Sequence, residues 1–112
     1  WAVGAGYQLI DTAWIYDNEK EIGEVLHRLG ARDSVFLTTK LWRSHQGPDV
    51  LPKLKQSLRR LRTGHVDLWL LHWPGPGQHR FKRHQVPTDW TPATRVQTWK
   101  AMEEVYKSGM AK

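Results

Sequence analysis

Four side chains with proton-transfer chemistry occur at corresponding points of the sequence. Asp11, Lys40 and His72 each end a short apolar segment, and Tyr16 follows Asp11 by five residues. Taken alone, each has an ordinary structural explanation, as a turn cap, a solvated strand end or a buried histidine. Those explanations do not account for their occurrence together at equivalent positions. We therefore expect one site where a phenol, an amine, a carboxylate and an imidazole act together on a proton.

The segments that carry these side chains predict alternating strands and helices. Apolar and β-branched residues predict strands at residues 7–11, 34–40 and 66–72. Helical spacing of apolar residues predicts helices at residues 18–29, 48–63 and 96–107. This order is typical of parallel βα units, in which the carboxyl ends of the strands share one face. Because the active sites of such folds lie on that face, the four side chains are expected to converge there.

Each predicted helix has an expected start or an expected buried side. Asp17 or Asn18 can cap the first helix. The second has an apolar face, with its basic residues mostly on the opposite, solvated side: Leu51, Leu54, Leu58 and Leu61 against Lys53, Lys55, Arg59, Arg60 and Arg62. The third has four large residues along one side: Trp99, Met102, Val105 and Tyr106. A long loop is expected at about residues 73–95, before this helix.

Composition indicates one domain and excludes several classes of protein. A length of 112 residues allows a single domain with a modest core. No run approaches the roughly 18 apolar residues of a membrane-spanning helix, and the first residues do not resemble a signal peptide. The absence of cysteine excludes disulfides and agrees with a cytoplasmic location. The net charge of +6 favours anionic partners, which include nucleic acid, an anionic surface and a phosphorylated cofactor.

Three stretches of the sequence are similar to the aldo-keto reductase family. The first is GYQLIDTA at residues 6–13 with YDNE at 16–19, the second is TTKLW at 38–42, and the third is DLWLLHWP at 67–74. Residues 98–109 resemble the helix that leads to the family's next strand. The similarity runs through nearly the whole chain, with a less typical loop at about residues 75–95.

This resemblance implies part of a TIM, or (β/α)8, barrel: about three consecutive parallel βα units in one partial domain over residues 1–112. It also implies hydride transfer between a nicotinamide cofactor, NADPH or alternatively NADH, and an aldehyde or ketone. Tyr16 would be the proton donor, and Lys40, held by Asp11, would stabilise the phenolate that remains. His72 would donate a hydrogen bond to the carbonyl oxygen. Asp11 would also contact the ribose of the cofactor.

The resemblance further implies a substrate pocket with aromatic walls. Trp42 and Trp73 match positions that line the family's pocket, and Ile15 and His72 would join them. An apolar, aromatic pocket suits a small-molecule carbonyl substrate. No metal ion is expected, and no membrane partner.

Most of the family's cofactor-binding segments match no part of this sequence. A glycine-bearing strand is expected before Trp1, and a Ser-Asn-Phe segment and further cofactor-binding loops are expected after Lys112. Three βα units also leave apolar faces and parallel strand edges uncovered. We therefore expect the chain to be inactive alone and to need the remainder of the barrel or a covering partner.

Three other interpretations stay open at this point. A non-catalytic binding protein on a reductase-like scaffold would share the fold, although the presence of all four chemical residues argues against it. The basic cluster at residues 79–84 can contact phosphates, but no recognised nucleic-acid-binding motif accompanies it. A metal site of His72, His79 and His84 lacks any recognised ligand spacing.

Overall fold

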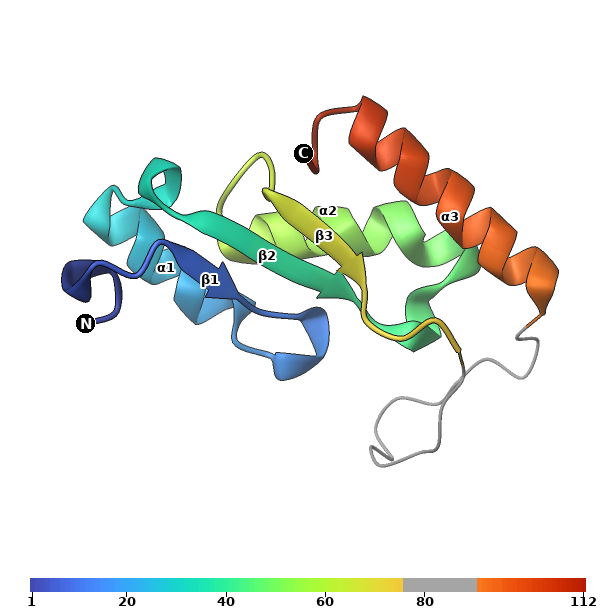
Figure 1. Cartoon of the computed structure of the whole chain (residues 1–112), viewed down its shortest axis with the longest axis horizontal. Helices are drawn as coiled ribbons and strands as arrows, with labels where there is room; N and C mark the ends of the chain where they lie inside the picture. The colour runs from blue at the N-terminus through green and yellow to red at the C-terminus, as the bar shows by residue number, and fades with distance from the viewer. Residues whose placement is uncertain (76–90) are drawn as a thin grey trace.

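The computed structural model describes residues 1–75 and 91–112. Its centre is a parallel sheet in the order β1 (Leu9–Asp11), β2 (Phe36–Leu41) and β3 (Leu68–Leu71) (Figure 1). All three predicted strands are confirmed, with shorter or slightly shifted spans. Lys40 pairs with Leu70 in the register, so the carboxyl ends of β2 and β3 lie side by side.

Three helices cover one face of the sheet: α1 (Glu19–Leu29), α2 (Val50–Leu61) and α3 (Pro92–Lys107). α2 packs against β2 and lies between α1 and α3, which both contact it. The predicted alternation of strands and helices is therefore confirmed. In this arrangement the loops that follow β1, β2 and β3 lie at one end of the sheet.

α3 begins at Pro92, four residues before its predicted start. Thr91 occupies the N-cap position, and its Oγ1 accepts the Thr94 N–H at 3.2 Å. Pro92 suits the first helical position because it has no N–H to satisfy there. The loop predicted at about residues 73–95 therefore includes the first turn of α3. Residues 76–90 of that loop lie outside the described part.

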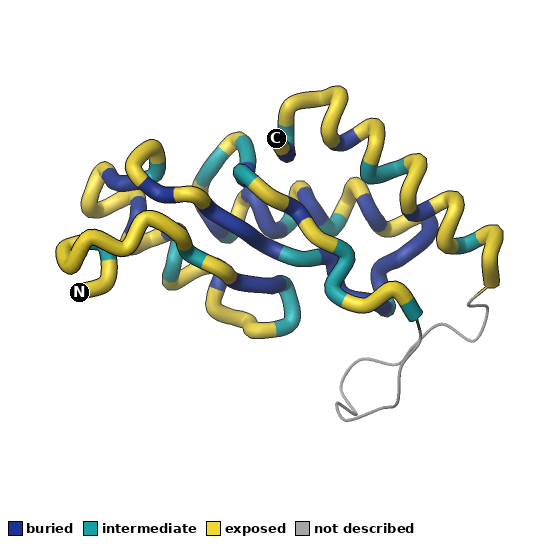
Figure 2. The backbone as a smooth tube through the Cα atoms, in the orientation of Figure 1, coloured by how far each residue is buried: buried dark blue, intermediate teal, exposed yellow. Residues whose placement is uncertain are grey.

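The core lies between the sheet and the helices. Leu37 and Leu41 of β2 and Trp69 of β3 are buried on this side. Alternate strand residues point to the opposite side, where Leu9 is 59% exposed and Leu70 is 39% exposed. Figure 2 shows this alternation of burial along β3, whereas β2 is buried or half-buried from Leu37 to Leu41. Parallel sheets are normally covered on both faces, but the described residues cover this sheet on one face only.

The buried side of α2 differs from the prediction at one position. Leu54, Leu58 and Leu61 are buried as expected, whereas Leu51 is 38% exposed. Val50, which is fully buried, lies one helical turn before Leu54 and takes the place predicted for Leu51.

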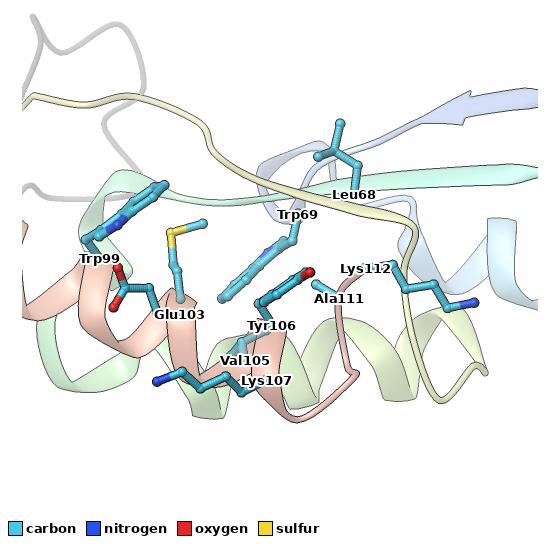
Figure 3. Close-up of a pocket in the computed structure, with 10 residues that line it drawn as sticks. Leu68, Trp69, Trp99, Glu103, Val105, Tyr106, Lys107, Ala111 and Lys112 are labelled. Atoms are coloured by element: carbon cyan, nitrogen blue, oxygen red, sulfur yellow. The ribbon is translucent and has the colours of Figure 1, made fainter.

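The four large residues of α3 lie along one side, as predicted, but that side is only partly covered. Val105 is buried, whereas Trp99 is 58% exposed and Tyr106 is 67% exposed. Together with Met102 they line a groove of about 430 Å³ between α3 and β3. Figure 3 shows this groove, whose walls are mainly apolar and aromatic.

Asn18 occupies the N-cap position of α1, but its side chain accepts no N–H from the helix. Its Oδ1 instead accepts the Thr12 hydroxyl at 2.6 Å. The predicted capping position is correct and the predicted capping bond is wrong, because the side chain closes the preceding loop instead.

The last residues of the chain extend the sheet. Ala111 forms a parallel bridge with Val66, and the Val66 N–H donates to the Met110 carbonyl at 3.1 Å. After α3 the chain therefore returns to the sheet beside the start of β3. None of the helices in the described ranges is both long enough and apolar enough to cross a membrane.

Candidate active site

Asp11 and Lys40 form an ion pair at the carboxyl end of the sheet. The Lys40 ammonium donates to Asp11 Oδ1 at 2.7 Å and to Oδ2 at 2.6 Å, and to the Thr12 carbonyl at 3.0 Å. Asp11 ends β1 and Lys40 lies one residue before the end of β2, so neighbouring strands impose the contact. The Lys40 side chain is only 13% exposed, which excludes the interpretation of a solvated strand end.

Tyr16 lies close to the Lys40 ammonium. Lys40 Nζ is 5.2 Å from the centroid of the phenol ring, a cation–π distance. Tyr16 ends the short 3-10 helix Trp14–Tyr16, and the following residue, Asp17, has a φ of 57°. This left-handed residue turns the chain towards α1 and leaves Tyr16 48% exposed. The phenol therefore lies at the open end of the sheet beside the ion pair.

Three aromatic rings contact His72. His72 follows β3 directly, and its backbone N–H donates to the Leu41 carbonyl at 3.0 Å. Its ring meets Tyr16 edge-on at 5.7 Å and Trp42 edge-on at 5.2 Å. It lies parallel to the Trp73 ring at 6.1 Å. The imidazole is thus held among aromatic groups on the same side as the phenol.

The pKa of His72 lies below its ordinary value of 6.5. Burial is the main cause, because it disfavours the charged imidazolium. The Lys40 ammonium and, more weakly, the Arg43 guanidinium lower the pKa further, while the Asp11 carboxylate opposes them. The imidazole is therefore neutral near pH 7 and carries one N–H. Its buried Nδ1 has no hydrogen-bond partner among the residues that the structure describes.

The residues predicted to line a substrate pocket have different environments. Trp42 is 2% exposed and Trp73 is 50% exposed, and both contact His72. Ile15 is half-buried in the 3-10 helix that ends with Tyr16. The structure thus brings the two tryptophans to the histidine and places Ile15 next to Tyr16 along the chain. Their binding of a substrate stays a prediction.

Asp11 is the one predicted cofactor contact. Its side chain stays 47% exposed, and each carboxylate oxygen keeps a second lone pair that can accept a hydroxyl. The open face of the sheet beside it presents Leu9, Leu68 and Leu70, which are exposed and cannot bind phosphate groups. Asp11 therefore has room for one hydroxyl contact to a dinucleotide, and this contact stays a prediction.

The alternatives that involve metal or nucleic acid fall mainly outside the described residues. His79, His84 and the rest of the basic cluster at residues 79–84 lie in the undescribed range. Within the described ranges, no three histidine, aspartate or glutamate side chains are grouped to hold a metal ion. Both alternatives stay untested predictions.

A cluster of polar side chains that the sequence did not predict joins α1, β2 and α2 next to the predicted site. Glu19 is fully buried, where its Oε1 accepts the Thr39 hydroxyl at 2.7 Å and its Oε2 lies 3.5 Å from Arg60 Nη1. The Trp14 indole N–H donates to Gln56 Oε1 at 3.0 Å. Arg60 was assigned to the solvated side of α2, but its side chain is only 29% exposed. Helical spacing alone carries no signal for these contacts, because they depend on how α1 and α2 pack.

The model of the Aldo/keto reductase family matches residues 1–112, and the chain belongs to this family. Deoxymugineic acid synthase 1-D of Triticum aestivum is 44% identical over 121 residues, which cover 99% of this chain and 38% of that protein. An aldo/keto reductase structure from Brucella melitensis superposes with a TM-score of 0.80 at 38% identity, covering 98% of this chain and 37% of that one. A Bombyx mori aldo-keto reductase in complex with NADP gives a TM-score of 0.78 at 32% identity, covering 99% and 36% of the two chains.

These matches confirm the family and the fold class predicted from the sequence. The three parallel βα units are part of an α/β TIM-barrel architecture, and members of the family are oxidoreductases. The chain spans about 38% of the length of the Triticum aestivum relative.

Proposed function

We propose that this chain forms the proton-donating side of the active site of an NAD(P)H-dependent reductase of aldehydes or ketones. The observation that carries the proposal is the convergence of Asp11, Tyr16, Lys40 and His72 at one end of the sheet. These residues come from three separate βα units, and together they provide an acid, a charge that stabilises its conjugate base, and a neutral hydrogen-bond donor.

Tyr16 is the proton donor in this proposal. The cofactor, when bound, supplies the hydride that reaches the carbonyl carbon. Negative charge then develops on the carbonyl oxygen, and the Tyr16 hydroxyl transfers its proton to that oxygen. The Lys40 ammonium, 5.2 Å from the ring centroid, stabilises the phenolate that remains. Asp11 holds the ammonium in this position, and in the direction of alcohol oxidation the phenolate accepts the proton.

His72 orients the carbonyl group. Because its imidazole is neutral near pH 7, it donates its one N–H to the carbonyl oxygen without holding a proton that competes with Tyr16. The rings of Trp42 and Trp73 restrict the orientation of the imidazole. With Ile15 they form the apolar wall of a pocket for a small-molecule carbonyl substrate.

NADPH is the cofactor that we propose, with NADH as the alternative. The NADP bound to the Bombyx mori relative and the positive net charge of this chain support this choice. Asp11 contacts a ribose hydroxyl in the proposal, and further βα units of a barrel supply the remaining contacts. Those units also cover the open face that carries Leu9 and Leu70. The 112-residue chain alone is therefore inactive in this proposal. The proposal also places the protein in the cytoplasm and assigns it no nucleic-acid partner.

A barrel graft tests the proposal. In this graft, residues 1–112 replace the matching segment of the Triticum aestivum relative, which retains the rest of its own barrel. With NADPH and a reactive aromatic aldehyde, we expect turnover by the graft and none by the 112-residue chain. Tyr16→Phe should lower kcat by about 10²- to 10⁴-fold, the usual contribution of a general acid. Tyr106→Phe is the matched control, because Tyr106 is exposed on α3, far along the chain from the site.

Three outcomes contradict parts of the proposal. Equal activity of the Tyr16→Phe and parent grafts excludes Tyr16 as proton donor. A folded graft without turnover supports the non-catalytic scaffold instead. Tyr16-dependent turnover by the 112-residue chain alone shows that further βα units are not required.

A further inference from the structure

Tyr16 is carried by a short loop between β1 and α1 that has little regular structure. A hydrogen bond from the Thr12 hydroxyl to Asn18 Oδ1, at 2.6 Å, closes the loop. Within it, Asp17 adopts a left-handed conformation with a φ of 57°, which is uncommon for a residue with a side chain. Such a conformation persists where surrounding contacts hold it. The position of the phenol therefore depends on what anchors the two ends of this loop.

Side chains of α2 anchor the amino end of the loop through Trp14. Gln56 Oε1 accepts the Trp14 indole N–H at 3.0 Å. Lys53 Nζ lies 5.1 Å from the centroid of the Trp14 ring, and Arg60 Cζ lies 5.5 Å from it. Lys53, Gln56 and Arg60 are spaced by three and four residues, so they occupy one face of α2. Trp14 is thus bound to α2 by a hydrogen bond and two cation–π contacts, and its ring also meets the His45 ring edge-on at 4.2 Å.

Arg60 also anchors the carboxyl end of the loop, through Glu19. Its Nη1 lies 3.5 Å from Glu19 Oε2, and the Glu19 side chain is fully buried. A buried carboxylate requires a positive partner, because an uncompensated buried charge is strongly unfavourable. The other Glu19 oxygen accepts the hydroxyl of Thr39, the residue before Lys40, at 2.7 Å. Glu19 therefore ties the loop both to α2 and to the strand that carries Lys40.

The packing of α1 on α2 makes this double contact possible. Gly23 of α1 faces the backbone of α2, where an added Cβ would lie 2.6 Å from the Leu61 carbonyl carbon and would also overlap the Arg60 carbonyl oxygen. The absence of a side chain at Gly23, one turn after Glu19, lets the two helices approach closely enough for Arg60 to reach the buried carboxylate.

We propose that Arg60 is a positioning residue that holds both ends of the Tyr16 loop and so sets the phenol against Lys40 and His72. The guanidinium is suited to both contacts, because it is planar, permanently charged and able to lie against an indole while pairing with a carboxylate. Arg60 acts only through Trp14 and Glu19 and has no direct role in the proton transfer. The inference rests on the proposed function only in taking Tyr16 as the proton donor.

The contacts of Arg60 with Trp14 and Glu19 together form a clamp on the Tyr16 loop. Amide hydrogen exchange of the 112-residue chain tests the clamp without any assay of activity. The Tyr16 and Asp17 amides donate to loop carbonyls, at 3.0 and 3.4 Å, and report on the loop directly. In Arg60→Gln, we expect their exchange to accelerate by about tenfold or more, while the amides of β2 keep their parent rates. Arg59→Gln removes the same charge from an exposed neighbour and should leave the loop unchanged. Arg60→Lys, which keeps the charge and loses the planar group, should be intermediate.

Trp14→Leu is the second variant, because it releases one end of the loop without leaving the Glu19 carboxylate unpaired. It should also accelerate the loop amides, even if Arg60→Gln fails to fold. The inference is overturned if the parent loop is unprotected, if Arg59→Gln has the same effect as Arg60→Gln, or if Trp14→Leu leaves the loop rates unchanged.

The barrel graft then links the clamp to the reaction. Arg60→Gln should lower kcat by roughly tenfold to a hundredfold with little change in KM, because it displaces a reacting group and not the substrate. An inactive graft with an Arg60-dependent loop contradicts the proposed function and leaves the clamp intact. An active, Tyr16-dependent graft with a loop that does not depend on Arg60 contradicts the clamp alone.

Discussion

The Lys40 ammonium contacts both carboxylate oxygens of Asp11, at 2.6 and 2.7 Å, because the two residues lie at the carboxyl ends of neighbouring strands. It also donates to the Thr12 carbonyl at 3.0 Å. Among the described residues the ammonium has no hydrogen bond to the Tyr16 hydroxyl, and its contact with Tyr16 is the cation–π contact with the ring. Lys40 can act on Tyr16 through its positive charge. The two hydrogen bonds to Asp11 set the position of that charge.

Replacement of Asp11 should reduce catalysis by releasing this charge. In the barrel graft, we expect Asp11→Asn to lower kcat by roughly tenfold to a hundredfold, because the amide cannot hold the ammonium as the carboxylate does. Steady-state kinetics with an aromatic aldehyde measures the effect. Asp33→Asn is the control, since Asp33 is exposed in a 3-10 helix at the opposite end of β2. Equal kcat values for Asp11→Asn and the parent would exclude this role.

Acid should destabilise the chain through His72. Burial lowers the pKa of folded His72 below 6.5, so the unfolded state binds more protons once the pH falls below that value. The contribution of the neutral imidazole to stability is fully present above about pH 6.5 and is lost as the pH falls through the folded pKa. Urea unfolding at a series of pH values from 7.5 to 5 (roughly the range where histidine titrates) should show a declining free energy of unfolding.

His72→Gln should remove part of this decline, because glutamine does not titrate. His27→Gln is the matched control, since His27 is exposed on α1. A pH dependence that is the same in His72→Gln and in the parent would show that other groups cause the loss.

Asp67 should contribute a separate loss of stability at lower pH. One of its oxygens, Oδ2, accepts the Arg32 Nη2 at 2.9 Å and the Leu37 N–H at 2.9 Å, which joins the amino ends of β2 and β3. Burial raises the pKa of Asp67, but the Leu37 N–H and the Arg32 guanidinium outweigh it, and the pKa lies below 3.8. This stability is present above 3.8 and is lost as the pH falls through the lower folded pKa.

Asp67→Ala should cost about 1–3 kcal/mol at neutral pH, because it leaves the Leu37 N–H and the Arg32 guanidinium without this acceptor. Urea unfolding measures the cost, and Asp33→Ala, at an exposed position, should change stability little. Similar losses in both variants would mean that the contact has no special weight.

The sequence predicts the site better than the contacts that support it. Asp11, Lys40 and His72 each end an apolar segment, and parallel topology alone requires such strand ends to meet. Glu19 and Arg60 differ from these residues, because a glutamate in a first helical turn and an arginine in a basic run both have the pattern of solvated residues. The burial of Glu19 and its contact with the half-buried Arg60 follow from the close approach of α1 and α2, which the periodicity of one helix does not encode.

The burial of the α3 residues could not be predicted from the sequence either, because they are less buried than their apolar spacing suggests. The spacing of Trp99, Met102, Val105 and Tyr106 predicts that they share one side, and they do. The spacing does not determine how deeply that side is buried, because burial depends on what packs against it. Burial is therefore complete only at Val105, which packs into the core between the sheet and the helices.

The contact between α1 and α2 should make Gly23 the most sensitive glycine of the helices. In an open helix position, alanine is more favourable than glycine by roughly 1 kcal/mol. At Gly23 the added Cβ would overlap the backbone of Arg60 and Leu61, which cannot move aside as a flexible side chain can. We expect Gly23→Ala to destabilise the chain by about 1–3 kcal/mol, as overpacking does, when measured by urea unfolding.

Gly64→Ala is the matched control, because nothing lies within 4 Å of a Cβ at Gly64 and its φ is not in the left-handed range. It should be neutral or slightly stabilising, since alanine restricts the unfolded chain. If Gly23→Ala also separates α1 from α2, it should accelerate exchange of the Tyr16 amide through loss of the Glu19–Arg60 contact. A Gly23→Ala chain as stable as Gly64→Ala would show that the helices can separate without cost, and the close approach would then not account for the buried ion pair.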